Sequence, residues 1–123
     1  MKADELKKRT KKFALSVIRA VEALPNGRAS NVIGNQLLRS ATSVAANYRA
    51  ACRAKSAADC VSKMGTVEEE ADEAMFWMEL LQESGLVNGK DIEELMDEAD
   101  QLVAIAVASI KTARSNKPRA KRQ

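Results

Sequence analysis

Apolar residues recur through most of the chain at spacings of three and four, the period of a helix that buries one face. Four segments carry this pattern, and we expect helices over residues 4–24, 30–53, 57–84 and 89–113. The core positions that the spacing predicts are Leu6, Phe13, Val17, Val21 and Leu24, then Leu37, Ala41, Val44 and Tyr48, then Cys60, Met64, Val67, Ala71, Ala74, Met78 and Leu81, and finally Ile92, Leu95, Ala99, Leu102, Ala106 and Ile110.

Local sequence signals predict the helix boundaries. Proline cannot continue a helix and Asn-Gly favours a turn, so Pro25-Asn26-Gly27 ends the first helix. Ser56, with Asp59 three residues later, is typical of a capping box at the start of the third helix. We also expect Ser30 or Asn31 to cap the second helix, Gly85 to end the third and Asn88 to cap the fourth.

Four long helices joined by short turns predict an all-α, antiparallel up-down-up-down four-helix bundle over residues 1–114, followed by a basic flexible tail at residues 115–123. Hydrophobic residues make up 46% of the chain and aromatic residues only 3%, which favours an aliphatic, alanine-rich core. Residues 103–108 are apolar on every side of the predicted fourth helix. We therefore expect a homo-oligomer that buries Ile105 and Val107 between subunits.

Charge is segregated along the sequence. Residues 1–55 contain twelve Lys or Arg and three Asp or Glu, residues 56–110 contain two and fourteen, and residues 111–123 contain six basic residues and no acid. Pairing between the basic and acidic helices explains much of this pattern but leaves a basic surplus at both termini. Such clusters bind phosphate backbones. The candidate nucleic-acid contacts are Lys7, Lys8, Lys11, Lys12, Arg19, Lys111, Arg114, Lys117, Arg119, Lys121 and Arg122.

Arg39 stands in a segment of small and apolar residues that suits the inside of a bundle. If the second and third helices are antiparallel, position 39 faces about position 71. We expect Arg39 to be largely buried in a structural ion pair with Glu69, Glu70 or Glu73, and its loss to be strongly destabilising.

The sequence contains no pattern typical of a catalytic or metal site. It has no histidine, the commonest general base and metal ligand, and no Gly-rich phosphate loop. Cys52 and Cys60 are expected to be buried reduced thiols, with a redox pair across a turn as the alternative. No signal peptide or membrane-spanning run is visible, so we expect a cytoplasmic protein that is not an enzyme, has no cofactor or metal, and does not contact a membrane.

Three motifs resemble those of the four-helix-bundle proteins encoded in bacterial ribosomal-RNA intervening sequences. They are Gln36-Leu37-Leu38-Arg39-Ser40-Ala41, Ser43-Val44-x-Ala46-Asn47 and Gly65-Thr66-Val67-x-Glu69. The accessory protein of diversity-generating retroelements is similar. This chain departs from the pattern after Asn47, where Tyr48-Arg49-Ala50-Ala51 replaces an Ile-Ala-Glu-Gly-like segment. The resemblance implies a bundle that assembles into a ring, pentameric in characterised relatives. In the retroelement relative it implies a basic surface that contacts nucleic acid and a reverse transcriptase.

These observations predict a non-enzymatic, homo-oligomeric accessory protein that binds RNA or DNA through basic patches, with a reverse transcriptase or another protein as a further candidate partner. The alternative is a protein-interaction scaffold whose charges serve assembly alone. With 3% aromatic residues, base stacking contributes little, so recognition of the backbone or of a folded RNA is the expected mode.

Overall fold

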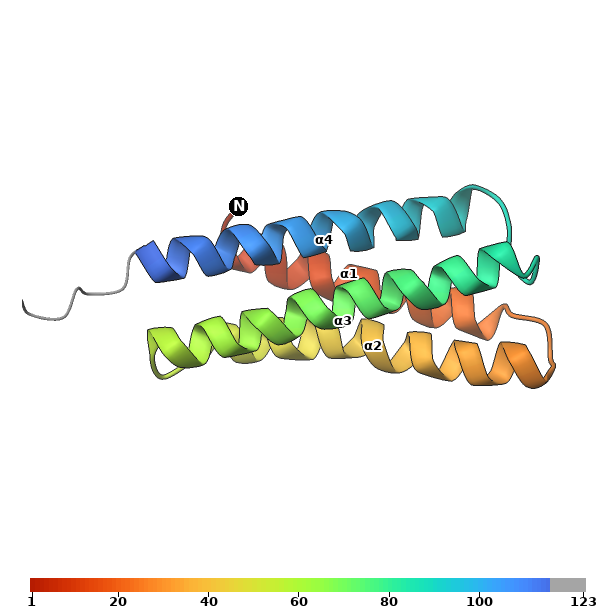
Figure 1. The fold of residues 1–123 in the computed structure, drawn as a ribbon, viewed down its shortest axis with the longest axis horizontal. Coiled ribbons are helices and arrows are strands. Elements are labelled where there is room, and N and C mark those ends of the chain that lie inside the picture. The colour runs from red at the N-terminus through yellow and green to blue at the C-terminus, as the bar shows by residue number, and fades with distance from the viewer. Residues whose placement is uncertain (116–123) are drawn as a thin grey trace, which may run out of the picture.

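The computed structural model describes residues 1–115 and contains four helices, α1 (Ala3–Glu22), α2 (Arg28–Cys52), α3 (Ala57–Glu83) and α4 (Lys90–Ser115). Successive helices pack side by side in alternating directions, as Figure 1 shows. The expected all-α fold with antiparallel neighbours is confirmed. The segment predicted to be a tail falls, apart from Ser115, outside the described residues.

Two of the predicted boundaries have the expected local structure. The Ser56 hydroxyl accepts a hydrogen bond from the Asp59 backbone N–H at 3.0 Å, which satisfies a donor that the start of α3 would otherwise leave free. Gly85 follows the end of α3 with a φ of +78°, a left-handed conformation that favours glycine at a helix end.

The predicted caps of α2 and α4 are wrong. Helix α2 already begins at Arg28, after Gly27 and without a side-chain cap, and Ser30 is buried inside its first turn. Helix α4 begins at Lys90, so Gly89 with a φ of +102°, and not Asn88, precedes it. Before α4, Gly89 takes a left-handed conformation that favours glycine, while Gly27 before α2 has an extended backbone.

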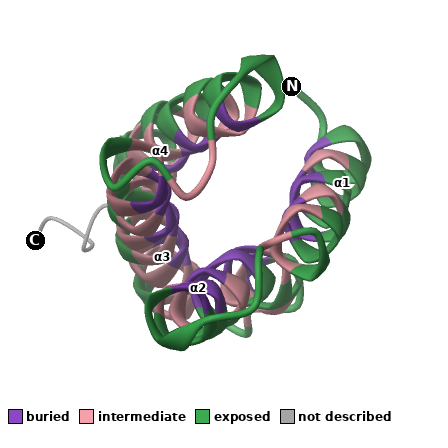
Figure 2. Ribbon diagram, turned by 90° about the vertical axis from the view of Figure 1, so that its right-hand side faces the viewer, coloured by how far each residue is buried: buried purple, intermediate pink, exposed green. Residues whose placement is uncertain are grey.

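The core consists of one inward-facing stripe from each helix (Figure 2). Every predicted core position of α3 is buried except Cys60, which is half-buried against the core. Two polar residues, Thr10 and Ser40, also lie in this core. Their hydroxyl groups donate to backbone carbonyls one turn earlier, so the polar atoms are satisfied within their own helices.

The expectation of two buried thiols is wrong for Cys52. This residue is the last of α2 and is exposed, while Cys60 in the first turn of α3 is half-buried, and both are free thiols. The reason is position: the core stripe of α2 ends at Ala51, so the next residue turns outward.

The second half of α1 packs closely against α2. A Cβ atom added to Gly34 of α2 would lie 3.0 Å from a methyl group of Leu24 and 3.4 Å from one of Val21. Because Gly34 has no side chain, these two residues approach the α2 backbone closely. The end of α1 is thereby held against α2, and its packing against α4 is much sparser.

Candidate nucleic-acid interface

Arg39 lies on the surface of the α2–α3 seam, so the prediction that it is buried is wrong. Its side chain is 51% exposed. The guanidinium donates to Glu70 at 2.8 Å and also to Glu73, two of the three carboxylates named from the sequence. Glu69 is exposed. Small residues around Arg39 indicated an interior position, but the core face of α2 runs through Leu37, Ala41 and Val44, and Arg39 points away from it.

The acidic partners of Arg39 hold it as a bridge between two helices. Burial of Glu70 raises the pKa of its carboxyl group, while hydrogen bonds from Arg39 and Ser43 lower it, and the net pKa lies below the ordinary value. The Arg39 side chain is therefore occupied in the fold. It belongs to the structure of the seam and is not a free cation for a phosphate.

The lysines at the start of α1 form the first part of a basic surface. Lys7, Lys8, Lys11 and Lys12 are all exposed over one and a half turns. Asp4 and Glu5 precede them in the first turn, where acidic side chains suit the positive end of the helix dipole. The lysines themselves point into solvent, as a phosphate contact requires.

Further basic residues reach the same end of the bundle from other helices. The antiparallel order places the end of α2, the start of α3 and the end of α4 beside the start of α1 (Figure 1). The last turns of α4 carry the exposed Lys111 and Arg114. We name this surface the basic end and define it by Lys7, Lys8, Lys11, Arg49, Arg53, Lys55, Lys111 and Arg114.

Sequence reasoning missed three members of the basic end, Arg49, Arg53 and Lys55. They lie on the last turn of α2 and in the turn after it, and all three are exposed. The available signal was their spacing within seven residues at the end of a predicted helix. The sequence pattern did not show that an antiparallel neighbour brings them to the α1 lysines.

Tyr48 shows how closely these segments meet. Burial raises the pKa of its hydroxyl group, and the hydrogen bond that this hydroxyl donates to Cys52 and electrostatic interactions with Cys60 and Asp4 raise it further. These residues come from the end of α2, the start of α3 and the start of α1. The three segments are therefore neighbours around one tyrosine at the base of the basic end.

Other predicted contacts do not gather there. Arg19 lies eleven residues along α1 from Lys8, about 17 Å at 1.5 Å per residue. Lys117, Arg119, Lys121 and Arg122 lie outside the described residues. Ile105 and Val107, the predicted oligomer contacts, are both half-buried.

Within residues 1–115, no group of three or more Cys, Asp or Glu side chains is arranged to hold a metal ion. In the same part of the chain, no helix combines the length and the apolar run that crossing a bilayer requires.

Comparisons with known proteins agree on one family. The profile of a family described as 23S rRNA-intervening sequence protein matches residues 2–108. The chain is also similar to a crystal structure from Bacteroides thetaiotaomicron VPI-5482, described as a protein of unknown function from the S23 ribosomal protein family. The two are 30% identical with a TM-score of 0.83, and the match covers 90% of this chain and 99% of the other. A comparison with curated proteins gives no match.

Proposed function

This chain belongs to the 23S rRNA-intervening sequence protein family, and we propose that it is a non-enzymatic, oligomeric accessory protein that binds nucleic acid at the basic end. One observation carries the proposal. Exposed Lys and Arg residues that are more than a hundred positions apart in the sequence, such as Lys7 and Arg114, lie at the same end of the bundle.

The chemistry of the basic end suits a phosphate backbone and not a base. Its eight defining side chains are cations, and each neutralised phosphate releases condensed counterions. Among residues 1–115 the one exposed aromatic side chain is Phe76, in the second half of α3 and therefore towards the opposite end of the bundle. Binding should therefore depend weakly on sequence and steeply on salt. An oligomer would present several basic ends together and raise the avidity.

The test is a fluorescence-anisotropy titration with a labelled folded RNA and with duplex DNA at about 50 and 200 mM salt. Lys7→Gln with Lys11→Gln should weaken binding and reduce the salt slope on duplex DNA by about two. Arg28→Gln with Lys90→Gln is the matched control, because it removes two exposed cations from the opposite end of the bundle. Deleting residues 116–123 should also weaken binding if the tail adds to this surface.

Two results would contradict the proposal. Equal losses in the Lys7/Lys11 variant and its control would mean that binding is non-specific attraction to the whole surface. A lack of nucleic-acid binding at low salt would favour the alternative function, a protein-interaction scaffold whose charges serve assembly alone. Intact RNA after long incubation is expected for a non-enzymatic role, and shortened RNA would argue against it.

A further inference from the structure

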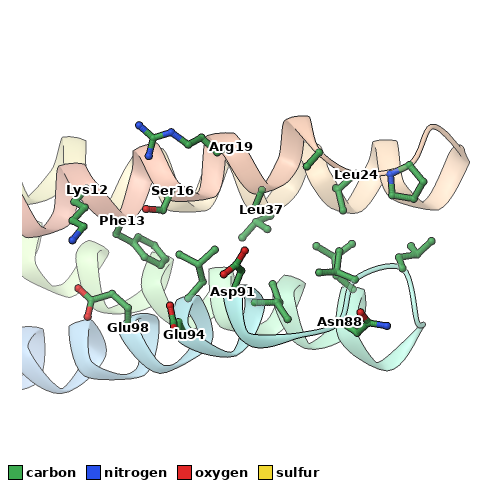
Figure 3. A pocket seen from close by; sticks show the side chains of 18 of the residues that line it. Lys12, Phe13, Ser16, Arg19, Leu24, Leu37, Asn88, Asp91, Glu94 and Glu98 are labelled. Atoms are coloured by element: carbon green, nitrogen blue, oxygen red, sulfur yellow. The ribbon is translucent and has the colours of Figure 1, made fainter.

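A long groove of about 900 Å³ separates the second half of α1 from the first half of α4. Its floor is apolar and includes the half-buried Leu24, Leu86, Val87 and Leu95, together with buried core residues such as Leu37. Figure 3 shows the α1 and α4 side chains on opposite sides of this space. The groove follows α1 from Arg9 to Ala23, about 21 Å at 1.5 Å per residue.

The sequence of α1 explains why this groove stays open. The close approach of Val21 and Leu24 to Gly34 holds the end of α1 against α2 and away from α4. On the side that faces α4, α1 carries Ser16, Ala20 and Ala23. These side chains are too short to span the gap.

The two walls of the groove carry opposite charges. Lys12 lies on the α1 wall, while Asp91 and Glu94 lie on the α4 wall. At one end Arg9 reaches across to Glu98 at 2.6 Å and closes the groove. Beyond that pair, the Asp91 carboxylate points into the open space in Figure 3.

We propose that this groove binds one amphipathic helix of a partner protein, with acidic residues on the flank that faces α1 and basic residues on the flank that faces α4. Helix-in-groove recognition places apolar anchors at spacings of three and four on an apolar floor. The small residues of α1 let a second backbone come close, and the charged walls pair with the flanks of the incoming helix.

The shape and charge of the groove favour an amphipathic helix over a nucleic acid or a small molecule. A nucleic acid would place phosphates beside Asp91 and Glu94, which repel them. A compact small molecule would leave most of the 21 Å of the α1 wall uncovered. A helix of about four turns matches that length.

The experiment uses three synthetic peptides of about sixteen residues with the same apolar stripe, labelled for fluorescence anisotropy. The first has one acidic and one basic flank, the second has two acidic flanks and the third has two basic flanks. The mixed-flank peptide should bind the full-length protein at least tenfold more tightly than the other two. Because a helix can enter in either direction, exchanging its two flanks would not be a useful control.

Reversing the acidic wall tests whether binding occurs in this groove. Asp91→Lys with Glu94→Lys makes both walls basic, and the preference should change from the mixed-flank peptide to the peptide with two acidic flanks. Glu93→Lys with Asp97→Lys is the matched control, because these exposed residues are on the same helix but do not line the groove. Ala20→Trp should fill the space and weaken all binding, while circular dichroism checks that the bundle is intact.

Three results would overturn the proposal. The first is equal binding of the three peptides, and the second is an unchanged preference in the Asp91/Glu94 variant. The third is dissociation of an oligomer by Ala20→Trp in light scattering, since the groove would then hold a second copy of this chain. Nucleic-acid binding by Ala20→Trp should remain as in the unmodified protein, so this test is separate from that of the basic end.

Discussion

The guanidinium of Arg9 on α1 donates two parallel hydrogen bonds, of 2.6 and 2.7 Å, to the carboxylate of Glu98 on α4. Both side chains are about a quarter exposed, and Arg9 also donates to Gln101. The pair joins the first and last helices, which pack sparsely against each other. Its two partners lie 89 positions apart in the sequence.

Glu98→Gln should lower the free energy of unfolding by about 1 kcal/mol, because it replaces a paired carboxylate with a neutral amide at a partly exposed site. Urea denaturation measures the change. Glu93→Gln is the control, since Glu93 is exposed on the same helix and faces away from α1. Equal losses in the two variants would mean that the Arg9–Glu98 pair contributes nothing to stability.

Glu70 should give the protein part of its resistance to acid. Its pKa in the folded state lies below the ordinary value of 4.5 despite the opposing effect of burial, because Arg39 and Ser43 stabilise the charged form. Its contribution is therefore fully present above the unfolded pKa and is lost as the pH falls through the lower, folded pKa.

Denaturation curves between about pH 5 and pH 3 test this pH dependence. The unmodified protein should lose more stability across that window than Glu70→Gln does. Glu69→Gln serves as the control, because Glu69 is exposed and next in sequence. A Glu70→Gln variant with the same acid dependence as the unmodified protein would show that the pairing with Arg39 does not shift the titration.

Gly65 lies inside α3, where glycine is unfavourable. A Cβ atom added at this position would meet no other atom within 4 Å. Gly65→Ala should therefore stabilise a monomer by about 0.5–1 kcal/mol through helix propensity. Thermal unfolding at low protein concentration measures this gain. If the variant is instead less stable and less associated, the space above Gly65 is used by a neighbouring subunit.

Two apolar residues of α4 are the predicted contacts between subunits. Ile105 and Val107 are half-buried in the single chain, and Val107 lies on the side of α4 opposite to Ile105. If these residues lie between subunits, Val107→Glu should reduce the molecular mass measured by light scattering. A monomer at micromolar concentration in the unmodified protein would contradict the prediction.

The period of the apolar residues was enough to predict the fold. The run from Met64 to Leu81 has the spacing of a buried stripe, and every position in it is buried. The caps were harder, because Ser30 and Asn88 match capping preferences but the helices begin at Arg28 and Lys90, after glycines. Local side-chain chemistry does not show which of two adjacent signals a turn will use.

The site was less predictable than the fold, because it depends on contacts between helices. Antiparallel register predicted the partners of Arg39 among Glu69, Glu70 and Glu73, and Glu70 and Glu73 are the two that it contacts. The rotation of α2 that exposes Arg39 did not follow from its small neighbours. The groove also depends on how α1 packs against α2, where Leu24 and Val21 approach Gly34 closely. A periodic pattern carries no information about such a contact between helices.

The close packing of Val21 and Leu24 against Gly34 also has a consequence for the motion of α1. The second half of α1 packs against α2 on one side, whereas on the side that faces α4 it borders the groove and makes few contacts. Segments with few apolar contacts open at low free energy, independently of the rest of a domain. Amide hydrogens of residues 16–22 should therefore exchange with solvent sooner than those at the centre of α3. The second half of α1 would then move relative to the rest of the bundle. A partner helix bound in the groove would pack against its α4 side and restrict that movement.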